Sequence, residues 1–415
     1  MSEVGTRAVE VAAPEPDLTA AQIVQRAAAL KPMIRDAQDE SERLGHYTEP
    51  LHREFLAAGF YRMLQPRRFG GYEFDLPTFW RAMVQISEGD PGTGWCLTLG
   101  SHHALVVGSR YPERGQREIF GPQGDFRGPH RPLPMGTAEP VEGGYVVSGT
   151  WDYCSGAPYA THFLGNVLVS GREGAYAPPV VVIPRAQITV LDDWGGGAQL
   201  GMQSSGSNSV VVENVFVPEH MVLDEDWTGA PDGPTPGTEL HRNPMYLGRV
   251  YGIYHAGLVV TVVGAARAAL QEYETTITTK KTPFPPQVMR YEHPDHQRTW
   301  GYARGLVDAA EALLYHAGEM YMEHCRRWAE QGVPFTVEDD GRLFVILQQS
   351  GRLASEAVEL LFHSSGSSAA RQGERMQRYF RDVAMYRGHI AAQYLNLASN
   401  LARVHFGLSS RMLGG

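Results

Sequence analysis

Acidic residues are missing from the end of this sequence. No Asp or Glu occurs from residue 383 to residue 415, and His389 stands within that stretch. An enzyme that needs a carboxylate base cannot take it from this segment, which offers an imidazole instead.

Cysteine is also scarce. The 415 residues include Cys96, Cys154 and Cys325 and no CxxC pair, which argues against a disulfide framework and a structural zinc site. No apolar run approaches the roughly 20 residues of a membrane span, and the first residues carry acids and prolines instead of a signal-peptide core. We expect a cytoplasmic protein with no membrane partner and no bound metal.

Positive charge is in deficit. The chain has 36 Lys and Arg against 46 Asp and Glu, a net charge of -10, and this balance opposes binding to a phosphate backbone. We therefore expect no nucleic-acid partner. Hydrophobic residues at 43% and charged residues at 20% are typical of a soluble globular protein, and a chain of this length normally divides into two or three units.

The hydrophobic period changes twice along the chain. After a loose tail at residues 1–17, apolar residues recur every three to four positions in residues 18–131, which predicts an N-terminal helical domain. The period becomes two in residues 132–227, typical of a small antiparallel β-barrel. A Gly- and Pro-rich linker at residues 228–240 precedes a C-terminal four-helix bundle at residues 241–415. The predicted fold class is mainly α with a central β domain.

The bundle is predicted from four amphipathic runs, at residues 246–278, 296–331, 337–364 and 374–408. Their connections are short, as in an antiparallel bundle. Apolar stripes on more than one face favour association between subunits. We expect a homotetramer or a dimer.

Four motifs occur in the order and at the intervals of a known superfamily. They are LAAGFYRMLQPRRFGG (residues 56–71), GGYVVSGTWDYCSG (143–156), GMQSSGSNSVVVENVFVPE (201–219) and RYFRDV (378–383). Together with the order helical, β, helical bundle, they resemble the acyl-CoA dehydrogenase superfamily over residues 18–408. That resemblance implies the acyl-CoA dehydrogenase-like fold.

Three motifs are similar to one branch of that superfamily, the two-component flavin-dependent monooxygenases that include 4-hydroxyphenylacetate and steroid-phenol hydroxylases. WDYCSG (151–156) resembles a Trp-x-x-x-Ser-Gly motif whose Ser lies against flavin N5. GWCLTLGSHH (94–103) resembles a Trp followed eight residues later by an active-site His, and RDVAMYRGH (381–389) a late Arg-Asp followed by His. The spacing in the second motif selects His103 over His102.

The resemblance implies three catalytic roles. Ser155 would bond to flavin N5, His103 would contact or deprotonate a substrate hydroxyl, and His389 would lie beside a flavin C4a-hydroperoxide as a hydrogen-bond donor or proton source. An imidazole with a pKa near 6.5 suits proton transfer at neutral pH. His102 is kept as a second candidate for substrate binding. The residues expected at the cofactor are Trp95, Trp151, Ser155, Gly156 and Ser367, with the two Trp rings as walls of the flavin and substrate cavity.

The implied activity is hydroxylation of an aromatic or polycyclic small molecule with molecular oxygen and reduced FMN or FAD. No nicotinamide-binding module is visible, so a separate NAD(P)H:flavin reductase is expected as a partner. The alternatives are an N- or S-oxygenase on the same scaffold and an acyl-CoA dehydrogenase-like FAD enzyme. The latter would need a carboxylate base such as Glu272 or Glu292.

Two further patterns have simpler interpretations. Residues 195–197 are three glycines without a phosphate-binding frame, and we interpret them as a flexible loop over the active site. His293 and His296 have metal-like spacing, but Pro294 disrupts a helix there and no third ligand is evident. A solvated turn is expected at this position.

Overall fold

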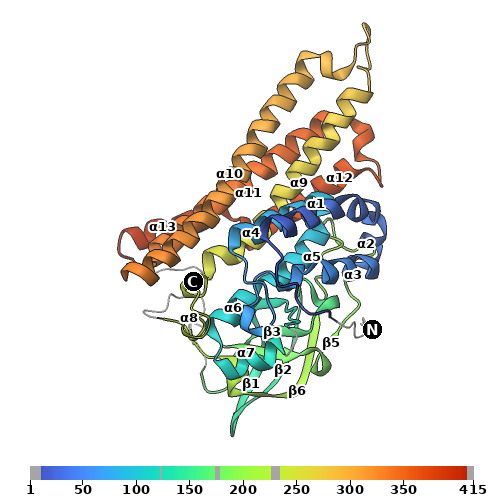
Figure 1. The fold of residues 1–415 in the computed structure, drawn as a ribbon. Helices are drawn as coiled ribbons and strands as arrows, with labels where there is room; N and C mark the ends of the chain where they lie inside the picture. Colours follow the sequence, from blue (N-terminus) through green and yellow to red (C-terminus); the bar gives the residue numbers. More distant parts are fainter. Residues whose placement is uncertain (1–10, 122–123, 173–177, 226–233, 409–415) are drawn as a thin grey trace.

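The chain folds into a helical amino-terminal part, a β-sheet and a second, longer set of helices (Figure 1). The computed structural model describes residues 11–121, 124–172, 178–225 and 234–408. The α-helices are α1 (Ala20–Asp36), α2 (Gln38–Leu44), α3 (Glu49–Ala58), α4 (Leu76–Gly89), α5 (Pro91–His102), α6 (Ala104–Arg110), α7 (Glu113–Phe120), α8 (Pro236–His241), α9 (Tyr251–Thr279), α10 (Pro294–Gln331), α11 (Val337–Ser365), α12 (Arg375–Gly388) and α13 (Tyr394–His405). The strands are β1 (His130–Val141), β2 (Gly144–Trp151), β3 (His162–Val169), β4 (Val180–Pro184), β5 (Thr189–Val190), β6 (Val210–Pro218) and β7 (Val222–Leu223).

This order follows the predicted succession of helical, β and helical segments, and the molecule is mostly helical. Residues 1–10 of the predicted tail and 228–233 of the predicted linker lie outside the described residues. The domain boundaries themselves remain predictions. Within the described residues, no helix has the length and apolar character needed to cross a membrane.

Side-chain caps fix where the amino-terminal helices begin. Thr19 and Gln22 form a reciprocal capping box at the start of α1. Asp75 accepts a hydrogen bond from the backbone N–H of Thr78 at the start of α4, and Asp90 accepts one from Thr93 at the start of α5. The caps set the register in which α4 buries its apolar face between α1 and α9.

One mixed sheet holds the described strands, in the order β5-β6-β2-β1-β3-β4-β7. Neighbours are antiparallel except β1 and β3, which run parallel, so the prediction of a purely antiparallel sheet is wrong at this pair. Hydrophobic periodicity reports which face of a strand is buried and is blind to strand direction. Trp151 fills the sheet's core, where a Cβ atom on Gly136 would come within 2.2 Å of its ring.

The helix α9 is the centre of the C-terminal part and packs against α10, α11 and α12 and also against α4 and α5 of the amino-terminal part. The last predicted helical run, residues 374–408, is not one helix. α12 ends at Gly388, a short 3-10 turn follows (Ile390–Ala392), and α13 then begins at Tyr394. His389 has an extended backbone, and its side chain accepts a hydrogen bond from the Ala391 N–H, a local bond that competes with helix continuation.

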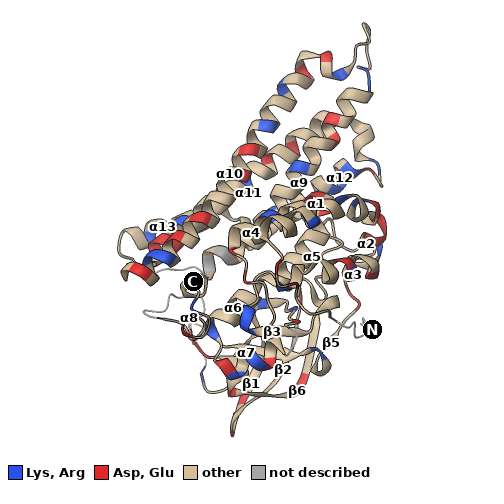
Figure 2. Cartoon of the chain, viewed as in Figure 1, with Lys and Arg blue, Asp and Glu red and all other residues tan. Residues whose placement is uncertain are grey.

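A buried carboxylate joins α1, α4 and α9. Glu88 is fully buried and lies 3.0 Å from Lys31 Nζ and 2.9 Å from Arg267 Nε, with Arg35 at 3.7 Å. Several cations around one buried acid offset the cost of removing it from water. Elsewhere on the visible ribbon both signs of charge are interspersed, as along α10 (Figure 2).

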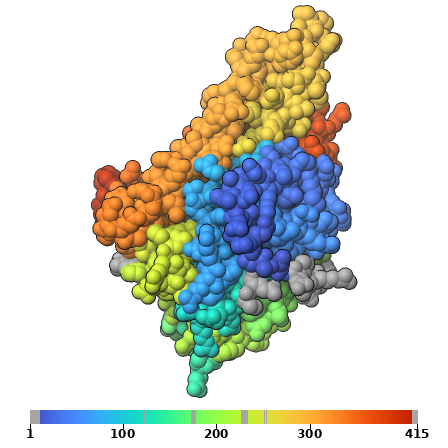
Figure 3. All heavy atoms as spheres, in the orientation of Figure 1, coloured from blue at the N-terminus to red at the C-terminus, as the bar shows by residue number. Residues whose placement is uncertain are grey.

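The hairpin formed by α9 and α10 projects beyond the rest of the molecule (Figure 3). Its tip carries Phe284, which is 79% exposed. The sheet lies at the opposite end of the molecule (Figure 1). The end of α5 and the start of α9 meet between these two extremes.

We expect Gly264→Ala to destabilise the protein by about 2 kcal/mol, because added volume at a close helix contact forces the backbones apart. A Cβ atom at Gly264 of α9 would lie 2.4 Å from Ser87 Cβ of α4. Gly301→Ala is the matched control, since a Cβ there meets nothing within 4 Å in the exposed part of α10, and it should stabilise by about 0.5 kcal/mol. Urea denaturation measures both; equal effects would contradict the tight α4–α9 contact.

Candidate active site

Trp95 joins the helical part of the molecule to the sheet domain. Its indole N–H on α5 donates a 3.0 Å hydrogen bond to Ser155 Oγ, which lies in the turn after β2. Gly156 in that turn has φ +93, and a Cβ atom there would lie 3.0 Å from Gly100 Cα of α5. Glycine is therefore required for the turn to approach α5 closely enough for this bond.

Two more hydroxyls stand behind Ser155. Its Oγ lies 2.7 Å from Ser207 Oγ, which in turn lies 2.7 Å from Ser205 Oγ, and all three side chains are buried. A hydroxyl has one proton and two lone pairs, so Ser155 keeps one position beyond Trp95 and Ser207. That position suits a polar ring atom of a bound molecule.

His389 lies against the same Trp ring. The centroids of Trp95 and His389 are 5.9 Å apart with the planes at 72°, an edge contact. The Ala391 N–H donates to His389 Nδ1 at 3.0 Å, which places the imidazole proton on Nε2. Burial, together with the nearby cation of Arg131, lowers the pKa of His389 to about 4. His389 is therefore a neutral hydrogen-bond donor through Nε2.

His103 has the opposite tautomer. Its Nδ1 lies 2.6 Å from the Gly128 carbonyl oxygen and must donate to it, so Nε2 carries a lone pair. Nε2 is buried without a hydrogen-bond partner in the described structure. Burial lowers the pKa of His103 to about 4, well below the value near 6.5 expected from sequence. His103 can accept a hydrogen bond, but it is too weak a base to ionise a phenol, whose pKa is about 10.

His102 points to a different neighbour. It stacks on Phe79 at 5.9 Å, and its Nδ1 would lie 3.1 Å from a Cβ atom at Gly257 of α9. Burial lowers its pKa to about 3. Consecutive residues at the end of α5 thus direct one imidazole toward Gly128 and the other toward α9.

Sequence reasoning missed a polar group at the start of α9. The Tyr254 hydroxyl bonds to His130 Nδ1, and His130 Nε2 lies 2.7 Å from Asn166 Oδ1. The Tyr254 ring lies 5.0 Å from that of His103. No short motif contains these residues, because α9, β1 and β3 meet only in the folded chain. Burial lowers the pKa of His130 to about 3.

His255, the next residue on α9, is close enough to His389 for the two imidazoles to interact electrostatically. Burial, together with the nearby His389, lowers its pKa to about 3. Its ring contacts that of Phe344 at 4.5 Å. The start of α9 therefore contacts the surroundings of both candidate catalytic histidines.

Two predicted cofactor residues do not join this group. Trp151 is fully buried, and its indole N–H donates to the Asn166 carbonyl oxygen at 3.0 Å, so it anchors the end of β2 instead of lining an open wall. Ser367 is exposed before the start of α12, whereas His389 follows its end. The 14 residues of α12 separate them by roughly 20 Å.

The three glycines at 195–197 are held more firmly than a flexible loop requires. A Cβ atom at Gly195 would lie 2.3 Å from Gly45 Cα, and Gly196 N–H donates to the Glu42 carbonyl oxygen at 3.1 Å. Trp194 also donates to the Met202 carbonyl oxygen at 3.2 Å. This end of the loop is packed onto α2.

The candidates for other chemistries lie elsewhere. Glu272 is 17 residues beyond His255 on α9, or about 25 Å along the helix, and Glu292 lies in the hairpin that follows. Neither carboxylate is near Trp95. His296 bonds to the Tyr273 hydroxyl at 2.7 Å, and no cluster of three metal-ligating side chains occurs among the described residues.

Comparison with known proteins gives one family match and many full-length relatives. Residues 256–394 match the family model described as the acyl-CoA dehydrogenase C-terminal domain. The chain is 29% identical over 371 residues to the flavin-dependent monooxygenase oxygenase subunit HsaA of Rhodococcus jostii (strain RHA1), covering 89% of this chain and 94% of that protein. It is 24% identical over 414 residues to the p-hydroxyphenylacetate 3-hydroxylase oxygenase component of Acinetobacter baumannii, covering 97% and 93%.

A solved structure agrees with these sequence matches. The crystal structure of 3-HSA hydroxylase from Rhodococcus sp. RHA1 superposes with a TM-score of 0.83 at 27% identity. The match covers 94% of this chain and 99% of that one. The similarity therefore extends over all three segments of the fold.

The buried histidines predict acid sensitivity. His102 has a pKa of about 3 in the folded state and about 6.5 when unfolded, so only the unfolded chain gains its proton as the pH falls below 6.5. Its contribution to stability is complete above pH 6.5 and decreases toward pH 3. We expect His102→Leu to gain about 2 kcal/mol relative to the parent between pH 7.5 and pH 5. Urea denaturation at both values measures this; parallel pH dependence would contradict it.

Proposed function

We propose that this chain hydroxylates an aromatic or polycyclic molecule that bears a hydroxyl group. The comparisons confirm its resemblance to the two-component flavin-dependent monooxygenases of the acyl-CoA dehydrogenase superfamily. Both the sequence and the comparisons indicate an enzyme that uses a reduced flavin. One observation carries the assignment of the site: Trp95 contacts both Ser155 and His389, so a β-domain hydroxyl and an imidazole from the end of α12 face one place.

The residues around Trp95 fit a flavin. Ser155 offers a buried hydroxyl with one open hydrogen-bonding position, and Trp95 offers flat aromatic surface. When bound, reduced FMN or FAD would supply the two electrons that activate molecular oxygen, one atom of which is transferred to the substrate while the other leaves as water. Gly156 keeps the Ser155 turn against α5.

His103 is the proposed acceptor for the substrate hydroxyl. Its Nε2 lone pair is fixed by the bond from Nδ1–H to Gly128, and a buried acceptor without a partner favours a ligand that brings a donor. A hydrogen bond from the substrate hydroxyl raises electron density on the aromatic ring. Complete proton transfer to an imidazole with a pKa of about 4 is disfavoured by about 8 kcal/mol against a phenol.

His389 is the proposed donor. Its Nε2–H is held in place by the main-chain bond to Nδ1, and its low pKa keeps it neutral at pH 7. A neutral donor stabilises developing negative charge on oxygen without attracting a permanent anion. The buried Trp95 ring covers one side of His389 and limits the access of water there.

Three finer features belong to the same proposal. A separate NAD(P)H:flavin reductase would supply the reduced cofactor, as the name "oxygenase component" of the Acinetobacter relative suggests. The sheet would close as a β-barrel, and α9 to α12 would form a four-helix bundle that associates into a homotetramer or dimer. Ser367, exposed before α12, would contribute to cofactor binding only from another part of such an assembly.

Replacing His103 tests the function directly. We expect His103→Ala to lower the yield of hydroxylated phenol by about 100-fold, because the substrate loses the acceptor that activates it. Oxidation of bound reduced flavin by oxygen should continue. Stopped-flow mixing with oxygenated buffer, followed by product analysis over phenols, indoles and polyketide aromatics, measures both.

His102→Leu is the control for this experiment, and it should keep hydroxylation within a few fold of the parent. Unchanged oxygenation in His103→Ala would favour the N- or S-oxygenase alternative. Bleaching of bound flavin by acyl-CoA without oxygen would establish the dehydrogenase alternative instead.

A further inference from the structure

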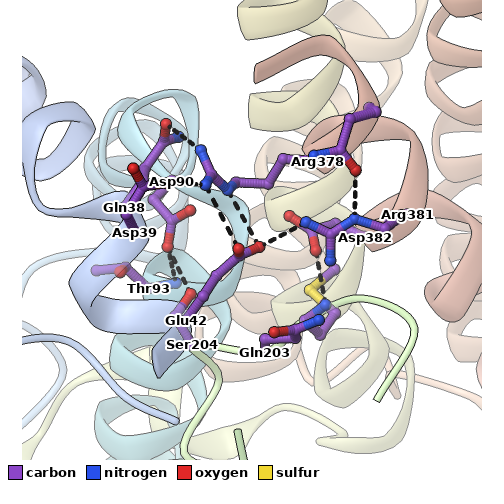
Figure 4. A network of polar contacts seen from close by, with 12 residues as sticks. Gln38, Asp39, Glu42, Asp90, Thr93, Gln203, Ser204, Arg378, Arg381 and Asp382 are labelled. Atoms are coloured by element: carbon purple, nitrogen blue, oxygen red, sulfur yellow. Dashed lines mark hydrogen bonds and ion pairs between the residues drawn. The ribbon is translucent and has the colours of Figure 1, made fainter. Parts of the chain in front are cut away.

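One polar network lies beside the candidate site and has no role in the chemistry described above. It joins α2, α5, α12 and the segment 200–204 that precedes β6 (Figure 4). Arg378 and Arg381 of α12 both bind Glu42 of α2, at 3.1 and 2.8 Å. The same helix carries Asp382, which is 2% exposed.

Asp382 holds the main chain of the neighbouring segment. Its Oδ1 accepts a 2.6 Å hydrogen bond from the Met202 N–H. Arg381 adds a 2.9 Å bond to the Leu200 carbonyl oxygen, and a Cβ atom at Gly201 would lie 2.2 Å from the Arg381 carbonyl oxygen. α12 and this segment are therefore in direct backbone contact.

The segment is also fixed on its other side. Ser204 donates to Asp90 Oδ2 at 2.6 Å, and the same oxygen accepts from the Thr93 N–H at the start of α5. Gly206 N–H donates to the Gly45 carbonyl oxygen at 2.7 Å. These bonds position Ser205 and Ser207, the hydroxyls that stand behind Ser155.

The contacts form a closed circuit. From Asp382 it passes through Met202 to Ser207, then to Ser155 and Trp95, whose ring touches His389. His389 directly follows the end of α12, seven residues beyond Asp382 and about 10 Å away. The two polar groups of the candidate site are thus connected both by Trp95 and by α12.

We propose that Asp382 is a positioning residue that, by holding Met202, fixes the distance between His389 and Ser155. The inference rests on the proposed monooxygenase function. A buried carboxyl group costs free energy, and a surface of α12 made only for packing would not need one. Burial raises the pKa of Asp382 well above its usual range. The bond to Met202 needs only an acceptor oxygen at this position, which an amide also offers.

The test compares Asp382→Ala with Asp382→Asn, which keeps the acceptor oxygen. We measure product formed per reduced FMN consumed, the dissociation constant of oxidised FMN, and the visible spectrum of the bound flavin. Asp382→Ala should lower the product yield per flavin by about fivefold, the effect of losing one buried hydrogen bond, and shift the spectrum. Asp382→Asn should match the parent in both readouts. A parent-like Asp382→Ala, or an Asp382→Asn as defective as alanine, would overturn the proposal.

A second variant interrupts the same set of contacts at another residue, so that the proposal can still be tested if Asp382→Ala does not fold. Ser207→Ala removes one hydroxyl and should lower the yield in the same direction. The double variant Asp382→Ala/Ser207→Ala should be no worse than the poorer single variant, because both interrupt one circuit. If the fold losses of the two single variants multiplied in the double variant, the two residues would act independently and the coupling would be refuted.

The parent protein separates this inference from the function on which it rests. If the parent forms no product from any phenol, the proposed function fails. The spectrum of bound oxidised FMN still tests the circuit in that case, since it requires no turnover. An unchanged spectrum in folded Asp382→Ala would then count against Asp382.

Discussion

The hydrogen bond from the Trp95 indole to Ser155 is the interaction on which the site depends. It is formed between a helix and a turn of the sheet domain, 60 residues apart in sequence. Glycine at 156 and the hydroxyls of Ser205 and Ser207 allow the turn to approach and keep it there. The ring of the same Trp then provides the surface against which the end of α12 rests.

Desolvation gives the histidines of this region their character. Burial lowers the pKa of each imidazole, so that it is neutral at pH 7. A hydrogen bond with a main-chain group then fixes which nitrogen carries the single proton. Gly128 makes His103 an acceptor, and Ala391 makes His389 a donor. The two imidazoles differ in function because different backbone groups face them, although their side chains and their pKa shifts are alike.

Motif spacing identified the residues that lie close along short segments. Trp95, Ser155 and His389 were all chosen from local patterns, and the structure brings them together, while their catalytic roles remain predictions. Tyr254 and His130 could not be chosen this way, because they meet their partners through the packing of separate elements. Asp382 stands in two of the motifs, but its contact with Met202 exists only in the folded chain. The fold class followed from periodicity, which could not reveal the parallel pairing of β1 with β3.

The end of the last helical run shows a second limit. Apolar residues continue at helical spacing past His389, so the pattern predicts one helix where there are two. A single imidazole-to-backbone bond outweighs that pattern locally.

A main-chain N–H fixes which nitrogen of His389 carries the proton. The tautomer therefore depends on the path of the backbone and not on the identity of a neighbouring side chain. Every residue except proline has this amide hydrogen, so the bond itself requires no particular side chain at position 391, although burial at 2% exposure keeps that side chain small. Substitutions in the residues after α12 can therefore change that end of the molecule while His389 keeps the same tautomer. The surroundings of the imidazole can evolve independently of its role as a donor.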